Sequence, residues 1–154
     1  MDEKNNDLHF LRYNINFIGI LHSLNMSTMI IREPSIEERE AIENYLYLDE
    51  EQLYSLLPQY DAAYNNTYFS PDGQQAAGKK IFDNLTQQLK QKICNEWSMC
   101  KKINDPVFED SLKLAIVIGD AIATSLIMLP PVLIASIILK IGLRKFCSCS
   151  DKNK

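Results

Sequence analysis

The stretch MLPPVLIASIILK, from Met128 to Lys140, is almost entirely apolar and contains two adjacent prolines. It lies inside a longer apolar run from Leu114 to Leu143, and the 19 residues between Asp120 and Lys140 carry no charge. A membrane-spanning helix needs about 20 apolar residues, so this run is at the threshold. Three structures fit it: a single kinked span, a helical hairpin in a membrane, and a helical hairpin in the core of a water-soluble fold.

The register around Pro130 and Pro131 favours a hairpin over one long helix. Reflecting the chain about the proline pair brings Asp120 close to Lys140. An isolated charge in an apolar setting is costly, and a facing charge of opposite sign lowers that cost. We therefore predict a hairpin turned at Pro130-Pro131, with an ion pair between Asp120 and Lys140.

Small residues recur at every fourth position of the first arm, at Ala115, Gly119 and Ala123. A stripe of this kind lets a second helix approach closely. It predicts the packing face of the hairpin. In a variant of the membrane interpretation, it is the face through which copies of the chain form a homo-oligomer and perturb a membrane.

The second arm carries a narrow polar stripe of Ser136, Lys140 and Arg144. In a water-soluble fold this stripe faces water along its length. In a membrane hairpin it faces Asp120 and Ser125. The basic tail after Leu143 favours the cytoplasmic side of a membrane, and a hairpin would keep both of its ends on that side.

Residues 34–104 carry the signals of a small helical domain. Capping residues precede its helices at Ser35, Asp49 and Ser70. After Pro71, apolar residues recur at about every fourth position, which predicts one amphipathic helix reaching about Lys101. Residues 1–33 give no consistent pattern, and we assign them to an N-terminal extension.

The cysteines and histidines form no recognisable catalytic or metal-binding pattern. Cys94 and Cys100 are spaced C-x5-C, and Cys147 and Cys149 are spaced C-x-C, whereas zinc sites usually use C-x2-4-C pairs. The N-terminus does not resemble an export signal, so we expect four reduced thiols. The pattern predicts no enzyme, no cofactor and no metal site, and a net charge of −4 argues against nucleic-acid binding.

A tyrosine-rich segment between two predicted helices is the candidate partner-binding loop, with Tyr64, Tyr68 and Phe69. Exposed aromatic side chains on a loop can anchor a protein partner. The alternative is that these rings fill gaps between short helices.

Together these patterns predict an all-α fold: an extension over 1–33, a helical domain over 34–104, an apolar hairpin over 105–147 and a polar tail over 148–154. The leading interpretation is a small non-enzymatic protein, anchored at the cytoplasmic face of a membrane by the hairpin, whose helical domain binds a protein partner. The alternative is a cytoplasmic helical interaction module or accessory subunit with the hairpin as its core.

Overall fold

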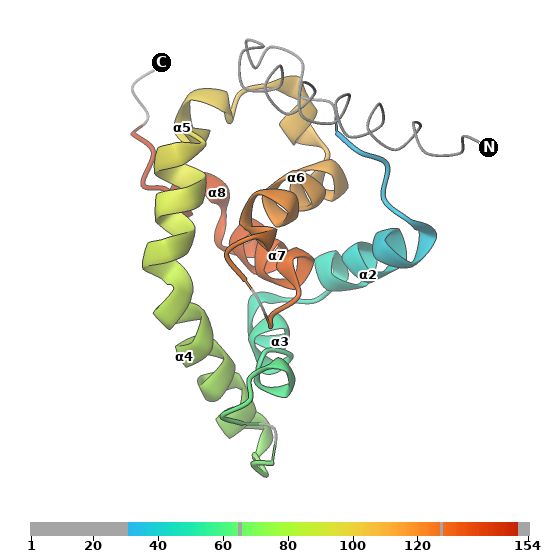
Figure 1. Ribbon diagram of the computed structural model, residues 1–154, viewed down its shortest axis with the longest axis vertical. Coiled ribbons are helices and arrows are strands. Elements are labelled where there is room, and N and C mark those ends of the chain that lie inside the picture. The colour runs from blue at the N-terminus through green and yellow to red at the C-terminus, as the bar shows by residue number, and fades with distance from the viewer. Residues whose placement is uncertain (1–30, 65, 127, 151–154) are drawn as a thin grey trace, which may run out of the picture. The chain divides into compact units, whose positions relative to one another are not determined.

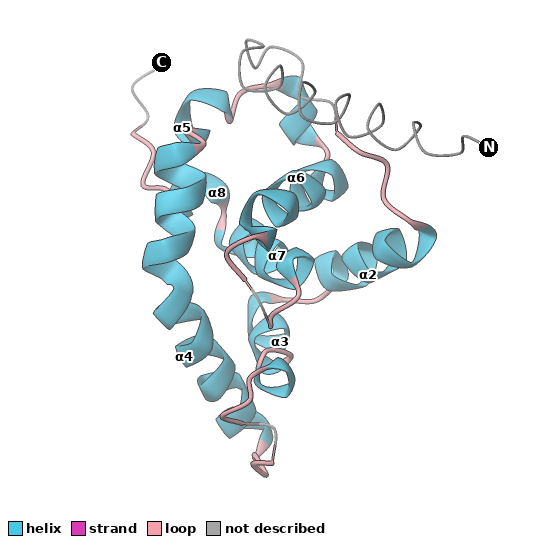
Figure 2. Cartoon of the chain, in the orientation of Figure 1, coloured by secondary structure: helices cyan, strands magenta, loops and turns pink. Residues whose placement is uncertain are grey.

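The computed structural model describes residues 31–64, 66–126 and 128–150, and the chain from Ile31 onward belongs to one compact unit. The α-helices of this part are α2 (Ile36–Tyr47), α3 (Glu50–Ser55), α4 (Pro71–Lys90), α5 (Met99–Lys102), α6 (Ser111–Ala123), α7 (Pro131–Ile141) and α8 (Leu143–Phe146). Two 3-10 turns, η1 (Pro58–Tyr60) and η3 (Pro106–Glu109), and a π-helical turn, η2 (Gln91–Glu96), connect them. The described part contains no strand, which confirms the predicted all-α class (Figure 2). Most of the predicted extension over 1–33 lies outside the described residues.

Side chains predicted from the sequence cap the first helices. Ser35 Oγ accepts a hydrogen bond from the Glu38 amide at 3.1 Å at the start of α2. Asp49 and Gln52 form a reciprocal capping box at the start of α3. Ser70 caps α4, and its next residue, Pro71, occupies a first-turn position where the missing N–H has no cost. These helices begin where local hydrogen bonding favours them.

The long amphipathic helix differs from its prediction at its end. Regular α4 ends at Lys90, and the chain continues through the π-helical turn η2 to Trp97. Ser98 then adopts a left-handed backbone with φ of 52°, which stops the helix before α5 begins. The prediction of one helix to about Lys101 is wrong here, because the pattern of apolar residues does not reveal a left-handed residue that interrupts it.

The apolar run folds into two helices, α6 and α7, connected by residues 124–130. Pro130 is the N-cap of α7 and Pro131 its first residue. The proline pair therefore starts the second arm, and the preceding loop forms the turn. At Gly119 the two helices approach closely, because a Cβ built there would lie 3.3 Å from Val132 Cγ1.

The hairpin supplies most of the buried core of the described part. Its buried apolar residues contact residues of α3, α4, η2 and α8 in one cluster that includes Leu53, Ile81, Ile93, Ile137 and Phe146. A second, smaller cluster joins Ile42 of α2 to Ala115 and Ile116 of α6. Figure 1 shows α6 and α7 between α4 on one side and α2 on the other. The predicted helical domain and the predicted hairpin thus share one core.

Of the helices that the structure describes, none combines the length and the apolar character that crossing a membrane requires; α6 has 13 residues and α7 has 11.

Helices α3 and α4 meet at Gly78 with almost no space between their backbones. A Cβ built on Gly78 would lie 1.8 Å from the carbonyl oxygen of Tyr54 and 2.5 Å from its carbonyl carbon. The Tyr54 ring packs against Phe82, one turn further along α4, with the ring centroids 5.6 Å apart. The absence of a side chain at Gly78 is what allows the two helices to come this close.

Candidate functional site

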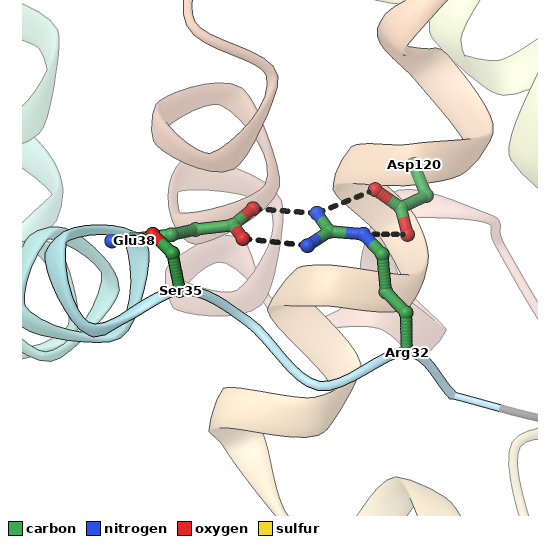
Figure 3. Close-up of polar contacts among 4 residues, drawn as sticks. All are labelled: Arg32, Ser35, Glu38 and Asp120. Carbon is green, nitrogen blue, oxygen red and sulfur yellow. Dashed lines mark hydrogen bonds and ion pairs between the residues drawn. The ribbon is translucent and has the colours of Figure 1, made fainter.

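The structure does not form the predicted ion pair between Asp120 and Lys140. Asp120 instead accepts two hydrogen bonds from the Arg32 guanidinium, at 2.8 and 2.9 Å (Figure 3). Lys140 Nζ donates to the carbonyl oxygen of Leu46 at 2.6 Å. That carbonyl belongs to the last turn of α2, where the helix has no backbone donors left and a cation is favoured. The predicted pair was wrong because it assumed a turn centred on Pro130 and Pro131, whereas the turn lies before these prolines.

Arg32 links two segments that are far apart in sequence. Its guanidinium donates to both carboxylate oxygens of Glu38, each at 2.6 Å, as well as to Asp120 on α6. The hydrogen bonds that Arg32 donates, to Glu38 first and to Asp120 second, raise the pKa of Arg32 above its ordinary value. The Arg32 guanidinium in turn lowers the pKa of Glu38. The Arg32 network, made of Arg32, Glu38 and Asp120, fastens the start of the compact unit to the hairpin.

The Arg32 network predicts a dependence of stability on pH. The pKa of Glu38 is lower in the folded chain than its usual value of 4.5. The ionised Glu38 therefore contributes fully to the free energy of unfolding above pH 4.5, and this contribution is lost as the pH falls through the pKa of the folded state. We expect the urea midpoint of the native chain to fall more than that of the Glu38→Gln variant between about pH 6 and about pH 3. Glu43→Gln, at an exposed position of α2, is the matched control and should behave like the native chain. Equal losses in the native chain and Glu38→Gln would contradict the network.

The polar stripe of the second arm has three different environments. Ser136 is fully buried, and its hydroxyl donates to the Val132 carbonyl oxygen of its own helix at 2.8 Å. Lys140 is exposed apart from its bond to α2, and Arg144 donates to Asn104 Oδ1 at 2.5 Å. The stripe therefore neither faces water along its whole length nor faces Asp120, so it matches neither of the two arrangements predicted for it.

The small-residue stripe is divided between the interior and the surface. Ala115 is fully buried in the cluster with Ile42, and Gly119 is buried against Val132 of α7. Ala123, the last residue of α6, is exposed. Two of the three predicted residues thus pack within this chain, and only Ala123 lies at the surface.

The aromatic loop between η1 and α4 is held at both ends. At its start, Asp61 Oδ1 accepts from the Ala63 amide at 2.8 Å, and at its end Ser70 caps α4. Tyr64 packs against the core, and its ring lies 5.6 Å from the ring of Phe69. Tyr68 lies between them in sequence and is fully exposed, with a relative accessibility of 103%. Of the three predicted partner residues, Tyr68 is thus the one presented to solvent.

The four cysteines correct the expectation of reduced thiols. They form two disulfides, Cys94–Cys147 and Cys100–Cys149, with Cα–Cα distances of 5.3 and 5.4 Å. Cys100 Sγ also lies 4.0 Å from the carbonyl oxygen of Cys147, so the two cross-links are neighbours. Both join the end of the chain to the segment from η2 to α5. We call this pair of cross-links the C-terminal clasp.

Backbone geometry sets the spacing of the two C-terminal cysteines. The Cys149 amide donates to the Arg144 carbonyl oxygen at 2.9 Å, and the Ser148 amide donates to that of Lys145 at 3.2 Å. This pair of bonds is the Schellman motif that ends α8. Ser148 occupies its left-handed position with φ of 53°, where glycine is usual. The sequence C-x-C thus follows a helix end, and the motif turns both cysteines toward η2 and α5.

Because a left-handed backbone is unfavourable for serine, glycine should fit better at this position. We expect Ser148→Gly to stabilise the native fold by about 0.5–1 kcal/mol, the part of the left-handed penalty that glycine avoids after its own entropy cost. Chemical unfolding of the disulfide-bonded chain gives this difference directly. Ser148→Ala is the matched control and should give no gain, since alanine keeps the Cβ. A destabilised glycine variant would contradict the left-handed geometry.

Burial differs between the cross-links of the C-terminal clasp. Cys94 and Cys147 are half-buried and pack against the main core cluster. Cys100 is exposed, and Cys149 is half-buried. Phe146, which directly precedes Cys147, is 4% exposed and packs against Phe82 with ring centroids 6.3 Å apart. Sequence spacing gave no signal for this pairing, because it depends on two distant segments meeting.

The clasp has a basic environment. Four cations lie close to its cysteines in sequence: Lys101, Lys102, Arg144 and Lys145. Burial lowers the pKa of Lys102, whose ammonium lies 5.9 Å from the centre of the Trp97 ring. Lys90 Nζ lies 5.7 Å from the centre of the Phe146 ring. Cations near a cysteine favour its thiolate form whenever the disulfide is open.

An open groove of about 810 Å³ runs beside the polar side of α4. Its lining is mostly amide and hydroxyl groups, with Asp83 and Lys90 as its charged members. Asp83 is already paired with Lys79 at 3.0 Å. The groove can offer hydrogen bonds to a ligand. No group of three metal-ligand side chains occurs in residues 31–64, 66–126 and 128–150.

Comparisons with protein families, with characterised proteins and with solved structures found no match to this chain.

Proposed function

We propose that this protein is a non-enzymatic helical interaction module whose apolar hairpin forms its own core. One observation carries this proposal: α3, α4, η2 and α8 of the same chain cover the hairpin residues that would otherwise face lipid. Leu133, Ile134, Ile137 and Ile138 of α7 each have no exposed surface. Apolar area that is already removed from water offers no further gain from a bilayer.

The aromatic loop is the surface that we assign to the partner. Tyr68 is fully exposed, whereas the turn at Asp61 and the Tyr64–Phe69 contact fix the backbone on both sides of it. A loop whose backbone is already ordered in this way loses less conformational freedom on binding than a disordered loop does. Tyrosine also offers a large apolar face with a polar tip, and it is enriched among interface hot spots.

Charge indicates the kind of partner. From Glu40 to Asp72 the chain carries seven acidic side chains and no lysine, arginine or histidine. This segment contains α3 and leads through the aromatic loop to the start of α4. An acidic surface attracts a basic one and suppresses association with acidic surfaces. We assign the surface to a protein with a basic rim around an apolar pocket that accepts the Tyr68 ring.

Sedimentation tests the first half of the proposal. The full chain, with its disulfides formed and without detergent, should stay in the supernatant after membranes are pelleted, and it should run as a monodisperse species. A pellet that resists a carbonate wash and dissolves in detergent would overturn the proposed core role of the hairpin. It would restore the membrane interpretation.

Site-specific photo-crosslinking in the source cells tests the second half. A photoreactive residue replacing Tyr68 should give one discrete crosslinked adduct. The yield of this adduct should fall when native chain is added as a competitor and when the salt concentration is raised. The same residue replacing Ile36, which is 73% exposed on α2 and lies outside the acidic segment, is the matched control and should not give that adduct. Identical adducts at both positions, or none at Tyr68, would remove the aromatic loop as the binding surface.

A further inference from the structure

We propose that the C-terminal clasp opens in two stages, and that Cys100–Cys149 is the site at which a dithiol reductant enters. In the first stage this outer disulfide is reduced and residues 148–150, which follow Cys147, are released. The inner disulfide, Cys94–Cys147, continues to hold α8 against the core. The inference goes beyond the proposed function and does not depend on it.

Burial carries the order of the two stages. Thiol–disulfide exchange requires a thiolate to reach a sulfur atom in line with the bond that breaks. Cys100 is exposed on α5, whereas Cys94 and Cys147 pack against the core beside Phe146. Cys149 is half-buried like Cys94 and Cys147, so Cys100 is the one exposed cysteine of the clasp. A reductant therefore attacks the outer disulfide first, at Cys100, and packing against the core slows its attack on the inner disulfide.

Charge assists the first stage. Lys101 follows Cys100 directly, and Lys145 and Arg144 lie in the helix that leads to Cys149. These cations attract an incoming thiolate and stabilise the cysteine thiolate that leaves. The acidic segment from Glu40 to Asp72, by contrast, would repel an incoming thiolate.

The exchange is balanced with a dithiol as the only co-reactant. One thiolate of the reductant attacks the sulfur of the exposed Cys100, the disulfide to Cys149 breaks, and Cys149 leaves as a thiolate. The second thiolate of the reductant then attacks its own partner sulfur, which releases the second cysteine. The reductant ends as a disulfide, two electrons have passed to the protein, and solvent protons complete the two thiols.

The second stage needs more structural change. Phe146 precedes Cys147 and contacts Phe82 of α4, and Leu143 is also buried. After the first stage, these contacts and the inner disulfide keep α8 in place. Opening the inner disulfide leaves the apolar contacts and the Arg144–Asn104 hydrogen bond, and α8 can then separate and uncover Phe82. The outer disulfide of the clasp is thus the one that a reductant opens first, and the inner disulfide keeps α8 packed on the core.

Timed reduction of the native full chain tests the order. The oxidised protein is incubated with dithiothreitol, samples are quenched with iodoacetamide, and labelled cysteines are mapped by mass spectrometry. We expect Cys100 and Cys149 to become labelled at least about tenfold faster than Cys94 and Cys147. Chymotryptic cleavage after the buried Phe146 should follow the inner disulfide and not the outer one.

A denatured control separates the fold from the local sequence. In concentrated urea all four cysteines are accessible, so the difference in rate should disappear. Equal rates in the native chain, faster opening of Cys94–Cys147, or a rate difference that persists in urea would each overturn the proposal. A native preparation whose four cysteines are labelled without any reductant would overturn it as well.

Discussion

Gly78→Ala should destabilise the protein by about 3 kcal/mol or more, the upper end of what overpacking costs. A methyl group at this position would occupy the space of the Tyr54 carbonyl, with only 1.8 Å between Cβ and oxygen. The alanine Cβ is fixed by the backbone of α4 and the Tyr54 carbonyl belongs to the backbone of α3, so no rotamer change can relieve the clash. Helices α3 and α4 would have to separate, and the packing of Tyr54 on Phe82 would be lost with them.

The sign of this effect is diagnostic. In an exposed helix interior, replacing glycine by alanine stabilises by about 1 kcal/mol, because alanine restricts the unfolded chain. The result at Gly78 should therefore have the opposite sign to the one that helix propensity predicts. Gly73→Ala in the first turn of α4 is the matched control: its Cβ would meet Ser70 Oγ at 3.1 Å, and a small shift of this capping side chain relieves the contact at the cost of a weaker cap. We expect a change there of at most about 1 kcal/mol in urea unfolding. A stabilised Gly78→Ala variant would refute the close approach of α3 and α4.

Removing both disulfides should destabilise the native fold by more than the sum of removing each one. Their sequence separations are 53 and 49 residues, so either cross-link alone restricts the unfolded chain by about 4 kcal/mol in the chain-entropy model. Once one is closed, the other closes only a small ring through the short stretches Cys94–Cys100 and Cys147–Cys149. That second closure contributes only about 2.5 kcal/mol.

Three alanine variants test this dependence. Cys94→Ala/Cys147→Ala and Cys100→Ala/Cys149→Ala should each lose about 2–3 kcal/mol, and the quadruple variant about 6–7 kcal/mol. Fully reduced native chain provides an independent measurement and should unfold at nearly the same denaturant concentration as the quadruple variant. Losses that simply add would show that the two cross-links restrict the unfolded chain independently, contrary to their shared anchoring segments.

The local parts of the fold could be predicted from the sequence. Caps at Ser35, Asp49 and Ser70 depend on residues three positions away, so the sequence contains both partners. The hairpin was predictable for a related reason, because a long apolar run with two prolines must be broken near them. The position of the turn was not, because proline fits both a turn and the first residue of a helix.

Features that join distant segments were missed. The disulfide pairing joins residues about 50 positions apart, and four cysteines allow three pairings that spacing does not distinguish. Arg32 reaches Asp120 across 88 residues, whereas the sequence offered Lys140 as the nearer cation. Gly78 carried one overlooked signal: a lone glycine within a strong helix pattern usually has a packing reason. Tyr68 was among the three predicted loop residues, but only the fold distinguishes it from Tyr64 and Phe69, which are partly buried.

The small cluster of Ile42 with Ala115 and Ile116 determines when α2 can pack against α6 during synthesis. Ile42, the buried residue of α2, contacts α6, which leaves the ribosome about 70 residues later. At about 5–20 residues per second this is a delay of several seconds. Through that interval α2 has its Ser35 cap, but neither Lys140 at its other end nor a surface to bury Ile42. The first helix of the compact unit is therefore among the last to dock, and the nascent chain must reach α6 before its beginning is secured.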